Sequence, residues 1–126
     1  MKKIINTTDA PAPIGPYNQA VLSNDTLYIS GQIPMDAATG EILSGDIKRE
    51  TEQCMKNLKA ILTEAKMSFE NVVKSSIFLA DMNQFTQVNE VYGAYFNTET
   101  APARETVEVA NLPKFVNVEI SMIAVK

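Results

Sequence analysis

Residues 116–125 constrain the fold more than any other segment, because two kinds of position alternate along them without a break. An alternation of period two places successive side chains on opposite faces of a β-strand. One face is wholly apolar and carries Val116, Val118, Ile120, Met122 and Ala124. The other face is mixed and carries Asn117, Glu119, Ser121, Ile123 and Val125. We therefore expect the apolar face to pack against helices.

Two segments have the periodicity of helices that would form this covering layer. In 46–66, apolar or small side chains recur every three or four residues: Ile47, Thr51, Cys54, Leu58, Ile61 and Ala65. In 82–96, the same spacing joins Phe85, Val88, Tyr92 and Tyr95. Asp46 is the expected N-cap of the first helix, and Asp81 with Gln84 predicts a capping box for the second.

The other regular segments have the composition of strands, and 19–31 is expected to be a hairpin with its turn at Ser23-Asn24-Asp25. The expected strands are 2–6, 19–22, 26–31, 72–80, 104–109 and 116–125. Together with the helices, this order predicts one α+β domain over residues 1–126, a single mixed β-sheet with two helices on one face.

The mixed face of the last strand is expected to be covered by another copy of the chain. Ile123 and Val125 lie on this face, and Val107 and Val109 belong to the preceding strand. Leaving such side chains in water costs free energy, so the pattern alone predicts an oligomer.

The absence of histidine narrows the possible chemistry, because the chain has no imidazole for acid–base catalysis, a Ser-His-Asp triad or a metal site. A single cysteine, Cys54, excludes an internal disulfide and a zinc site with several thiolates. We expect no metal. The net charge of −4 lacks the broad basic field of a nonspecific nucleic-acid binder. No signal peptide or membrane span is predicted, and we expect a soluble cytoplasmic protein.

Two charged residues are the strongest candidates for a functional site. Arg104 follows Ala101-Pro102-Ala103 at the start of a strand, where a guanidinium is suited to bidentate binding of a carboxylate or phosphate. The alternative is a surface arginine paired with a neighbouring glutamate. Glu119 lies between Val118 and Ile120. Such a carboxylate is exposed, paired with Arg104, or functional as a general base or water-orienting group.

Further candidates lie in loops and at element ends. Tyr17 follows Ile14-Gly15-Pro16, where its hydroxyl either faces a ligand or its ring packs over the core edge. Ser30 and Gly31 end a strand, where glycine allows a ligand to approach the backbone closely or simply makes a turn. Asn89 lies beside the aromatic stripe of the second helix and either serves a site or caps an edge.

Several short motifs occur in one order along nearly the whole chain, and together they resemble those of the RidA (YjgF) family of enamine and imine deaminases. The motifs are Ile14-Gly15-Pro16-Tyr17, Ser30-Gly31-Gln32-Ile33-Pro34, Asn89-Glu90-Val91-Tyr92, Pro102-Ala103-Arg104, Val107-Glu108-Val109-Ala110 and Val118-Glu119-Ile120.

This resemblance implies a fold similar to the Bacillus-type chorismate mutase and a homotrimer built around a central β-barrel, with three clefts at subunit interfaces. It also implies hydrolysis of reactive enamines and imines, derived from 2-aminoacrylate and 2-aminocrotonate, to 2-oxo acids and ammonia. The implied ligand is therefore a small imine or 2-oxo acid, and no cofactor is required.

The resemblance also assigns roles to residues. Arg104 would bind the substrate carboxylate, and Glu119 would position or activate the attacking water. The implied catalytic set is Arg104, Glu119 and Tyr17. The implied substrate-binding set is Arg104, Ser30, Gly31, Asn89 and Thr106.

Two positions depart from the family pattern. Thr106 stands where many members have cysteine, so thiol-dependent activity is not expected there, although its hydroxyl remains available to the cleft. Glu105 stands where many members have a small residue. Strand alternation should point Glu105 away from Arg104 and Thr106. If Glu105 reached the cleft instead, its carboxylate would repel an acidic substrate and lower activity.

Other functions remain open at this point. The same cleft would also suit a noncatalytic regulatory module that binds a small carboxylate without turnover. A ribonuclease or translation inhibitor is less favoured, because the chain is acidic, lacks histidine and has no interleaved basic and aromatic residues.

Overall fold

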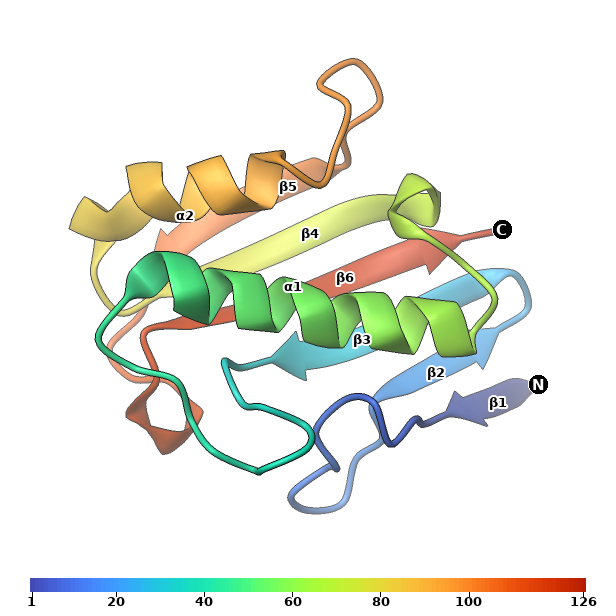
Figure 1. Ribbon diagram of the computed structural model, residues 1–126. Helices are drawn as coiled ribbons and strands as arrows, with labels where there is room; N and C mark the ends of the chain where they lie inside the picture. Colours follow the sequence, from blue (N-terminus) through green and yellow to red (C-terminus); the bar gives the residue numbers. More distant parts are fainter.

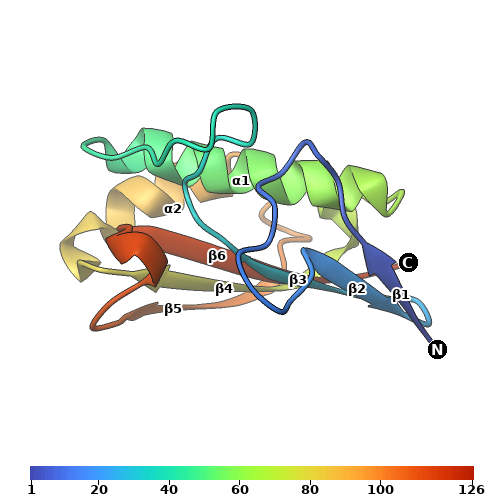
Figure 2. The ribbon, with the colours of Figure 1, turned by 90° about the horizontal axis from the view of Figure 1, so that it is seen from below.

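The computed structural model describes residues 1–126 as one six-stranded mixed sheet with two helices on one face (Figures 1 and 2). This arrangement confirms the predicted fold class. The strands are β1 (Lys2–Ile5), β2 (Ala20–Ser23), β3 (Thr26–Gln32), β4 (Val72–Leu79), β5 (Ala103–Glu108) and β6 (Val118–Val125). The helices are α1 (Ile47–Glu64) and α2 (Phe85–Gly93), and the 3₁₀ turns are η1 (Phe69–Asn71), η2 (Met82–Gln84) and η3 (Pro113–Phe115).

The sheet order is β1-β2-β3-β6-β4-β5, so the last strand of the chain lies between β3 and β4. β6 is antiparallel to both neighbours, and β4 and β5 form the parallel pair at one edge. β2 and β3 form the expected hairpin. No helix combines the length and hydropathy needed to cross a bilayer.

The predicted N-cap is present at α1, but the predicted capping box is absent at α2. Asp46 caps α1 as predicted, because its carboxylate accepts hydrogen bonds from the backbone N–H groups of Lys48 and Arg49. The capping box predicted for the second helix is wrong. Asp81 accepts a bond from the Asn83 N–H and so caps η2, whereas α2 begins at Phe85 with no side-chain cap. The chain first makes a 3₁₀ turn, which is common at helix N-termini.

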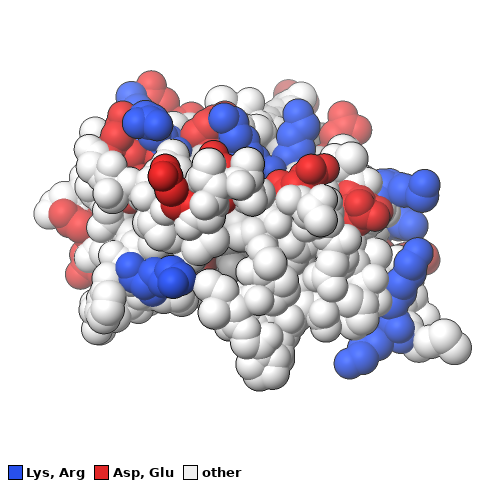
Figure 3. Space-filling model, turned by 60° about the horizontal axis from the view of Figure 1, so that its bottom comes forward, with Lys and Arg blue, Asp and Glu red and all other residues white.

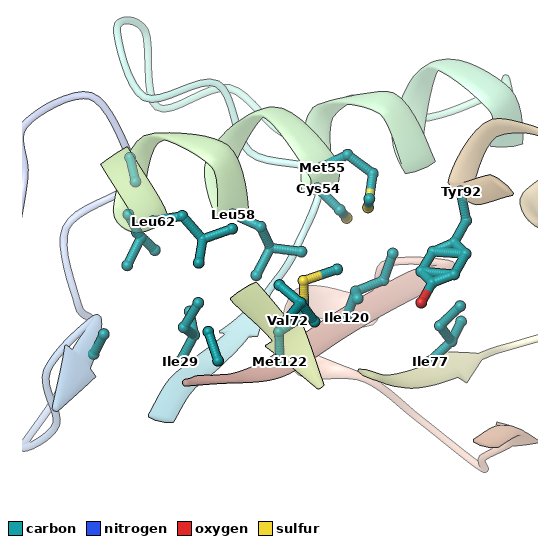
Figure 4. Close-up of a cluster of buried hydrophobic side chains, with 14 of the residues drawn as sticks. Ile29, Cys54, Met55, Leu58, Leu62, Val72, Ile77, Tyr92, Ile120 and Met122 are labelled. Carbon is teal, nitrogen blue, oxygen red and sulfur yellow. The ribbon is translucent and has the colours of Figure 1, made fainter. Parts of the chain in front are cut away.

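The hydrophobic core lies between the sheet and α1 (Figure 4). The alternate residues of β6 face inward as predicted, and Val118, Ile120 and Ala124 are completely buried. Leu58 and Ile61 of α1 are also completely buried. Burying one side chain of the size of leucine or isoleucine stabilises a fold by about 1.5–3 kcal/mol, so these contacts fix the face that β6 turns toward α1.

The opposite face of the sheet carries no layer of its own within the chain (Figure 2). Tyr28 of β3 and Val107 of β5 are 51% and 41% exposed on it. Ile123 pairs with Tyr28 in register, and Phe78 pairs with Val107. This face therefore leaves apolar side chains in contact with water in the single chain, among polar ones such as Ser76 and Ser121.

Buried polar side chains of α1 hold two loops against the sheet. The Asn57 amide donates hydrogen bonds to the carbonyls of Ile33 and Met35, at 3.1 and 3.0 Å. The Glu50 carboxylate accepts a bond from the amide of Asn117 at 2.8 Å. These contacts fix the segment after β3 and the segment between η3 and β6.

We expect Asn57→Ala to lower the free energy of unfolding by about 1–3 kcal/mol, because two loop carbonyls lose their hydrogen-bond donor. Urea denaturation at one fixed protein concentration measures the change. Lys59→Ala, on the exposed side of the same helix, is the matched control and should alter stability by less than about 0.5 kcal/mol. Equal stability of the two variants would contradict the anchoring role of Asn57.

Candidate active site

A cavity of about 540 Å³ opens where the ends of β3 and β6 meet two loops. Four of the predicted site residues lie around it, namely Tyr17, Ser30, Gly31 and Glu119. The rest of its lining is Ile14, Ile33, Pro113 and Lys114. Figure 3 shows a hollow on this side of the molecule, between an isolated basic group and an uncharged protrusion.

Glu119 lies directly over Gly31. A methyl group added at Gly31 would lie 2.7 Å from both Cδ and Oε2 of Glu119, which is closer than atoms pack. The pairing of β3 with β6 shifts register between Ile29 and Gln32, as a β-bulge does when one strand has an extra residue. Glycine at the bulge therefore makes the space that the Glu119 carboxylate occupies.

The Glu119 carboxylate has no ion-pair partner and makes no side-chain hydrogen bond within the chain. Partial burial raises its pKa above that of an ordinary glutamate, because the charged form is poorly solvated there. The predicted alternative of a salt bridge to Arg104 is not present within one chain. A half-buried, unpaired carboxylate in a cavity is typical of a general base.

Tyr17 and Ser30 form part of the cavity wall in different ways. Tyr17 is about half exposed, and its hydroxyl accepts a hydrogen bond from the Ile14 N–H at 3.3 Å. The Ser30 hydroxyl donates to the Asn18 carbonyl at 2.7 Å. Ser30 therefore anchors the loop that carries Tyr17, a structural role that the sequence did not indicate.

Arg104 lies on β5, on the face of the sheet that the helices cover, and α2 holds its side chain. Its Nη1 donates to Oδ1 of Asn89 at 2.7 Å. The guanidinium carbon lies 5.1 Å from the ring centroid of Tyr92 and 5.6 Å from that of Phe85, which is cation–π geometry. The Tyr92 hydroxyl is in turn bonded to Ser75 at 2.9 Å. The guanidinium is thereby oriented while its other N–H groups stay free for a ligand.

The residues on either side of Arg104 follow strand alternation. Glu105 points to the opposite face, as predicted, and is paired with Lys74 and Ser76. The contact with Lys74, followed by that with Ser76, lowers the pKa of Glu105. Thr106 faces the same side as Arg104, and its hydroxyl is buried without a hydrogen-bond partner.

Within one chain, the predicted site residues form two separate groups. β4 lies between β5 and β6, so Arg104 and Glu119 are two strand spacings apart, or about 10 Å. Arg104 is level with Ser75 and Glu119 with Phe78, three residues further along β4, which adds about 10 Å. Their side chains also leave opposite faces of the sheet. One small molecule cannot contact both groups in the same chain.

Four lining residues were not among the predicted site residues: Ile14, Ile33, Pro113 and Lys114. Lys114 and Phe115 both adopt left-handed backbone conformations with φ of 55°. Pro113 marks a turn here, but neither Lys114 nor Phe115 is a glycine or asparagine, so no residue type marks the left-handed conformation in the sequence. No group of three or more His, Cys, Asp or Glu side chains is arranged to hold a metal ion.

Comparison with known proteins covers almost the whole chain. A family model described as Endoribonuclease L-PSP matches residues 7–126. A RutC family protein of Pyrococcus horikoshii is 52% identical over 126 residues, which cover 100% of this chain and 99% of that protein. The 2-iminobutanoate/2-iminopropanoate deaminase of Mus musculus is 48% identical over 126 residues, covering 100% of this chain and 93% of that protein.

Solved structures agree with these sequence matches. YyfA from Yersinia pestis, a protein of the conserved Rid family, superimposes with a TM-score of 0.97 at 44% identity and full coverage of both chains. TdcF from E. coli, crystallised with bound serine, gives a TM-score of 0.92 at 42% identity, with 98% of each chain covered.

The sheet, its helical layer and the cavity beside Gly31 thus define a RidA-type domain. The chain belongs to the Endoribonuclease L-PSP family, also called the YjgF or RidA family, and the resemblance inferred from its motifs is confirmed.

Gly31→Ala should displace the Glu119 carboxylate toward solvent, because the added methyl group takes its place. We expect the pKa of Glu119 to fall toward the ordinary value of about 4.3. The cost in stability should be about 0.5–1.5 kcal/mol, since only the flexible end of a side chain has to move. NMR titration of the side-chain carboxyl carbons measures this pKa.

Gly93→Ala is the matched control, because a methyl group there meets no atom within 4 Å. It should leave the titration of Glu119 unchanged. An unchanged pKa in Gly31→Ala as well would show that Gly31 does not set the position of the carboxylate.

Proposed function

We propose that this protein hydrolyses small imino acids, and the enamines in equilibrium with them, to 2-oxo acids and ammonia. The observation that carries the proposal is the unpaired Glu119 carboxylate, held against Gly31 in a cavity with its pKa raised by burial. The full-length similarity to a mouse protein named 2-iminobutanoate/2-iminopropanoate deaminase supports the same reaction.

The proposed site is assembled from two copies of the chain in a homotrimer. The separation of Arg104 from Glu119 within one chain supports this arrangement, because each chain would then contribute its Glu119 to one site and its Arg104 to another. The exposed side chains of Tyr28 and Val107 support it too, since a neighbouring copy would remove them from water. In this proposal the β5 edge of one copy closes the cavity of the next.

Arg104 of one copy would bind the carboxylate of the substrate. Its guanidinium is already held by Asn89 and by the rings of Tyr92 and Phe85. A planar fork matches the two carboxylate oxygens, so binding also fixes the orientation of the adjacent C=N bond. Holding the substrate in this way supplies much of the entropic part of the barrier.

Glu119 of the other copy would act on water. Its carboxylate takes a proton from a water molecule while the water oxygen bonds to the carbon of the protonated imine, giving a neutral carbinolamine and a protonated Glu119. The proton on Glu119 then passes to the amino nitrogen, the C–N bond breaks and ammonia leaves. The hydroxyl gives its proton back to the Glu119 carboxylate as it becomes the carbonyl, and Glu119 releases that proton to the departing ammonia or to solvent. The imine carbon is already electrophilic, so positioning and proton transfer suffice.

RNA cleavage, which the description of the family names, is less well supported for this chain. Binding a nucleic acid requires neutralisation of several phosphates. The net charge is −4, and Lys114 is the one basic residue lining the cavity. TdcF with its bound serine instead supports a site for small amino-acid-like molecules in this family.

Subunit complementation tests the reaction and the shared site together. Arg104→Ala and Glu119→Gln should each lose nearly all acceleration of 2-iminobutanoate hydrolysis, measured as ammonia released above the spontaneous rate. The two variants, co-expressed with different tags and purified as mixed trimers, should recover about one third of wild-type activity. Every mixed trimer contains one interface at which both residues are intact.

The possible outcomes separate three cases. Mixed trimers with no activity would place Arg104 and Glu119 of the same chain in one site. Recovery of about one half of the wild-type activity would indicate that the site is shared in a dimer. Full activity of both single variants would refute the proposed mechanism, and no activity in the wild type would favour a module that binds carboxylates without turnover.

The pH dependence follows from the raised pKa of Glu119. A base works in its ionised form, so kcat/KM should fall as the pH decreases through this pKa. The acid limb should therefore lie above the ordinary glutamate value of about 4.3. In Gly31→Ala the acid limb of the kcat/KM profile should move toward lower pH. If the limb did not move, a group other than Glu119 would be responsible for it.

A further inference from the structure

Lys114 is the basic residue of the cavity, and neither the family motifs nor the proposed mechanism uses it. It lies in η3, on the wall beside Glu119, Ile14 and Tyr17. A basic side chain that lines a binding cavity can contact part of the ligand.

The backbone holds Lys114 in a specific and unfavourable conformation. Lys114 and Phe115 are consecutive left-handed residues, and such strain persists only where the surrounding structure imposes it. Here the turn is held by the Phe115 N–H, which donates to the Leu112 carbonyl at 2.8 Å, and by Asn117 through its bond to buried Glu50. The lysine is thus presented from a fixed turn.

The Lys114 ammonium is free to bind a ligand. It takes part in no ion pair, although the cavity contains the Glu119 carboxylate. Lys114 and Glu119 therefore line the same cavity without pairing with each other.

The size of the cavity leaves room beyond the reacting atoms. A five-carbon imino acid with two carboxylates has ten non-hydrogen atoms, which fill at most about 300 Å³ at the volume that liquid water takes per molecule. In the single chain the cavity measures about 540 Å³, before a neighbouring copy closes it. This volume exceeds that of the molecule, so a substrate held at one end by Arg104 of the neighbouring copy has space to extend a charged side chain toward Lys114.

We infer that Lys114 binds a second carboxylate, at the far end of the substrate side chain, so that imines of acidic amino acids are preferred over uncharged imines of equal length. This inference rests on the proposed deaminase function. Such imines arise by oxidation of the α-amino group of a dicarboxylic amino acid, which is the class of reaction that would supply this substrate.

The test compares two substrates with five carbons each, 2-iminoglutarate and 2-iminopentanoate, formed in the assay by oxidation of glutamate and norvaline. Lys114→Asn removes the charge but keeps a residue that tolerates the left-handed conformation. It should lower kcat/KM for 2-iminoglutarate about tenfold and leave that for 2-iminopentanoate unchanged. Lys114→Arg should retain most of the preference.

Lys66→Asn is the matched control, because Lys66 also has a left-handed backbone, with φ of 60°, and lies outside this cavity. It should leave kcat/KM unchanged for both substrates. An equal loss on both substrates in Lys114→Asn, or a wild type that does not favour 2-iminoglutarate, would overturn the inference while leaving the deaminase proposal intact.

Binding of the stable products gives a readout that does not depend on turnover. Calorimetry should show that 2-oxoglutarate binds the wild type more tightly than 2-oxopentanoate, and that Lys114→Asn removes the difference. If the wild type hydrolyses no imine, the proposed function fails, and equal binding of the two acids would then overturn the role of Lys114 separately.

Discussion

The alternation of β6 is the constraint on which the rest of the structure depends. Val118 and Ile120 are completely buried against the helical layer, so the intervening Glu119 must leave the opposite face of the same backbone. A slip of one residue would put the carboxylate into the core and two aliphatic side chains into water. The free energy that stabilises the hydrophobic core therefore also holds the candidate base at its cavity.

The position of Glu119 lowers the stability of the folded state. The fold raises the pKa of Glu119, so the folded state favours the protonated form more than the unfolded state does. The free energy of unfolding consequently falls as the pH rises through that pKa, and the ionised carboxylate destabilises the folded state at neutral pH. Gly31 leaves space for this side chain but has no side chain of its own to pack, and glycine in a strand further lowers the stability.

Local periodicity predicted the strands, both helices and the inward face of β6, because these features depend on neighbours within one segment. The order of strands in the sheet is nonlocal, so the sequence did not reveal that Arg104 and Glu119 lie on different faces, two strands apart. The sequence also did not predict the 3₁₀ turn before α2 or the left-handed backbone of Lys114, because tertiary contacts rather than residue type select these conformations.

The placement of the charges offers a reason for dividing the proposed site between copies. Arg104 is supported by a stack of side chains from α2, whereas Glu119 needs an apolar, partly closed surrounding that keeps its pKa high. A guanidinium beside that carboxylate in every free chain would pair with it and lower its pKa, which would weaken the base. Because the two groups lie on opposite faces of the sheet, they can approach each other only when two copies form an interface. The carboxylate of a bound substrate then pairs with the Arg104 guanidinium in place of Glu119.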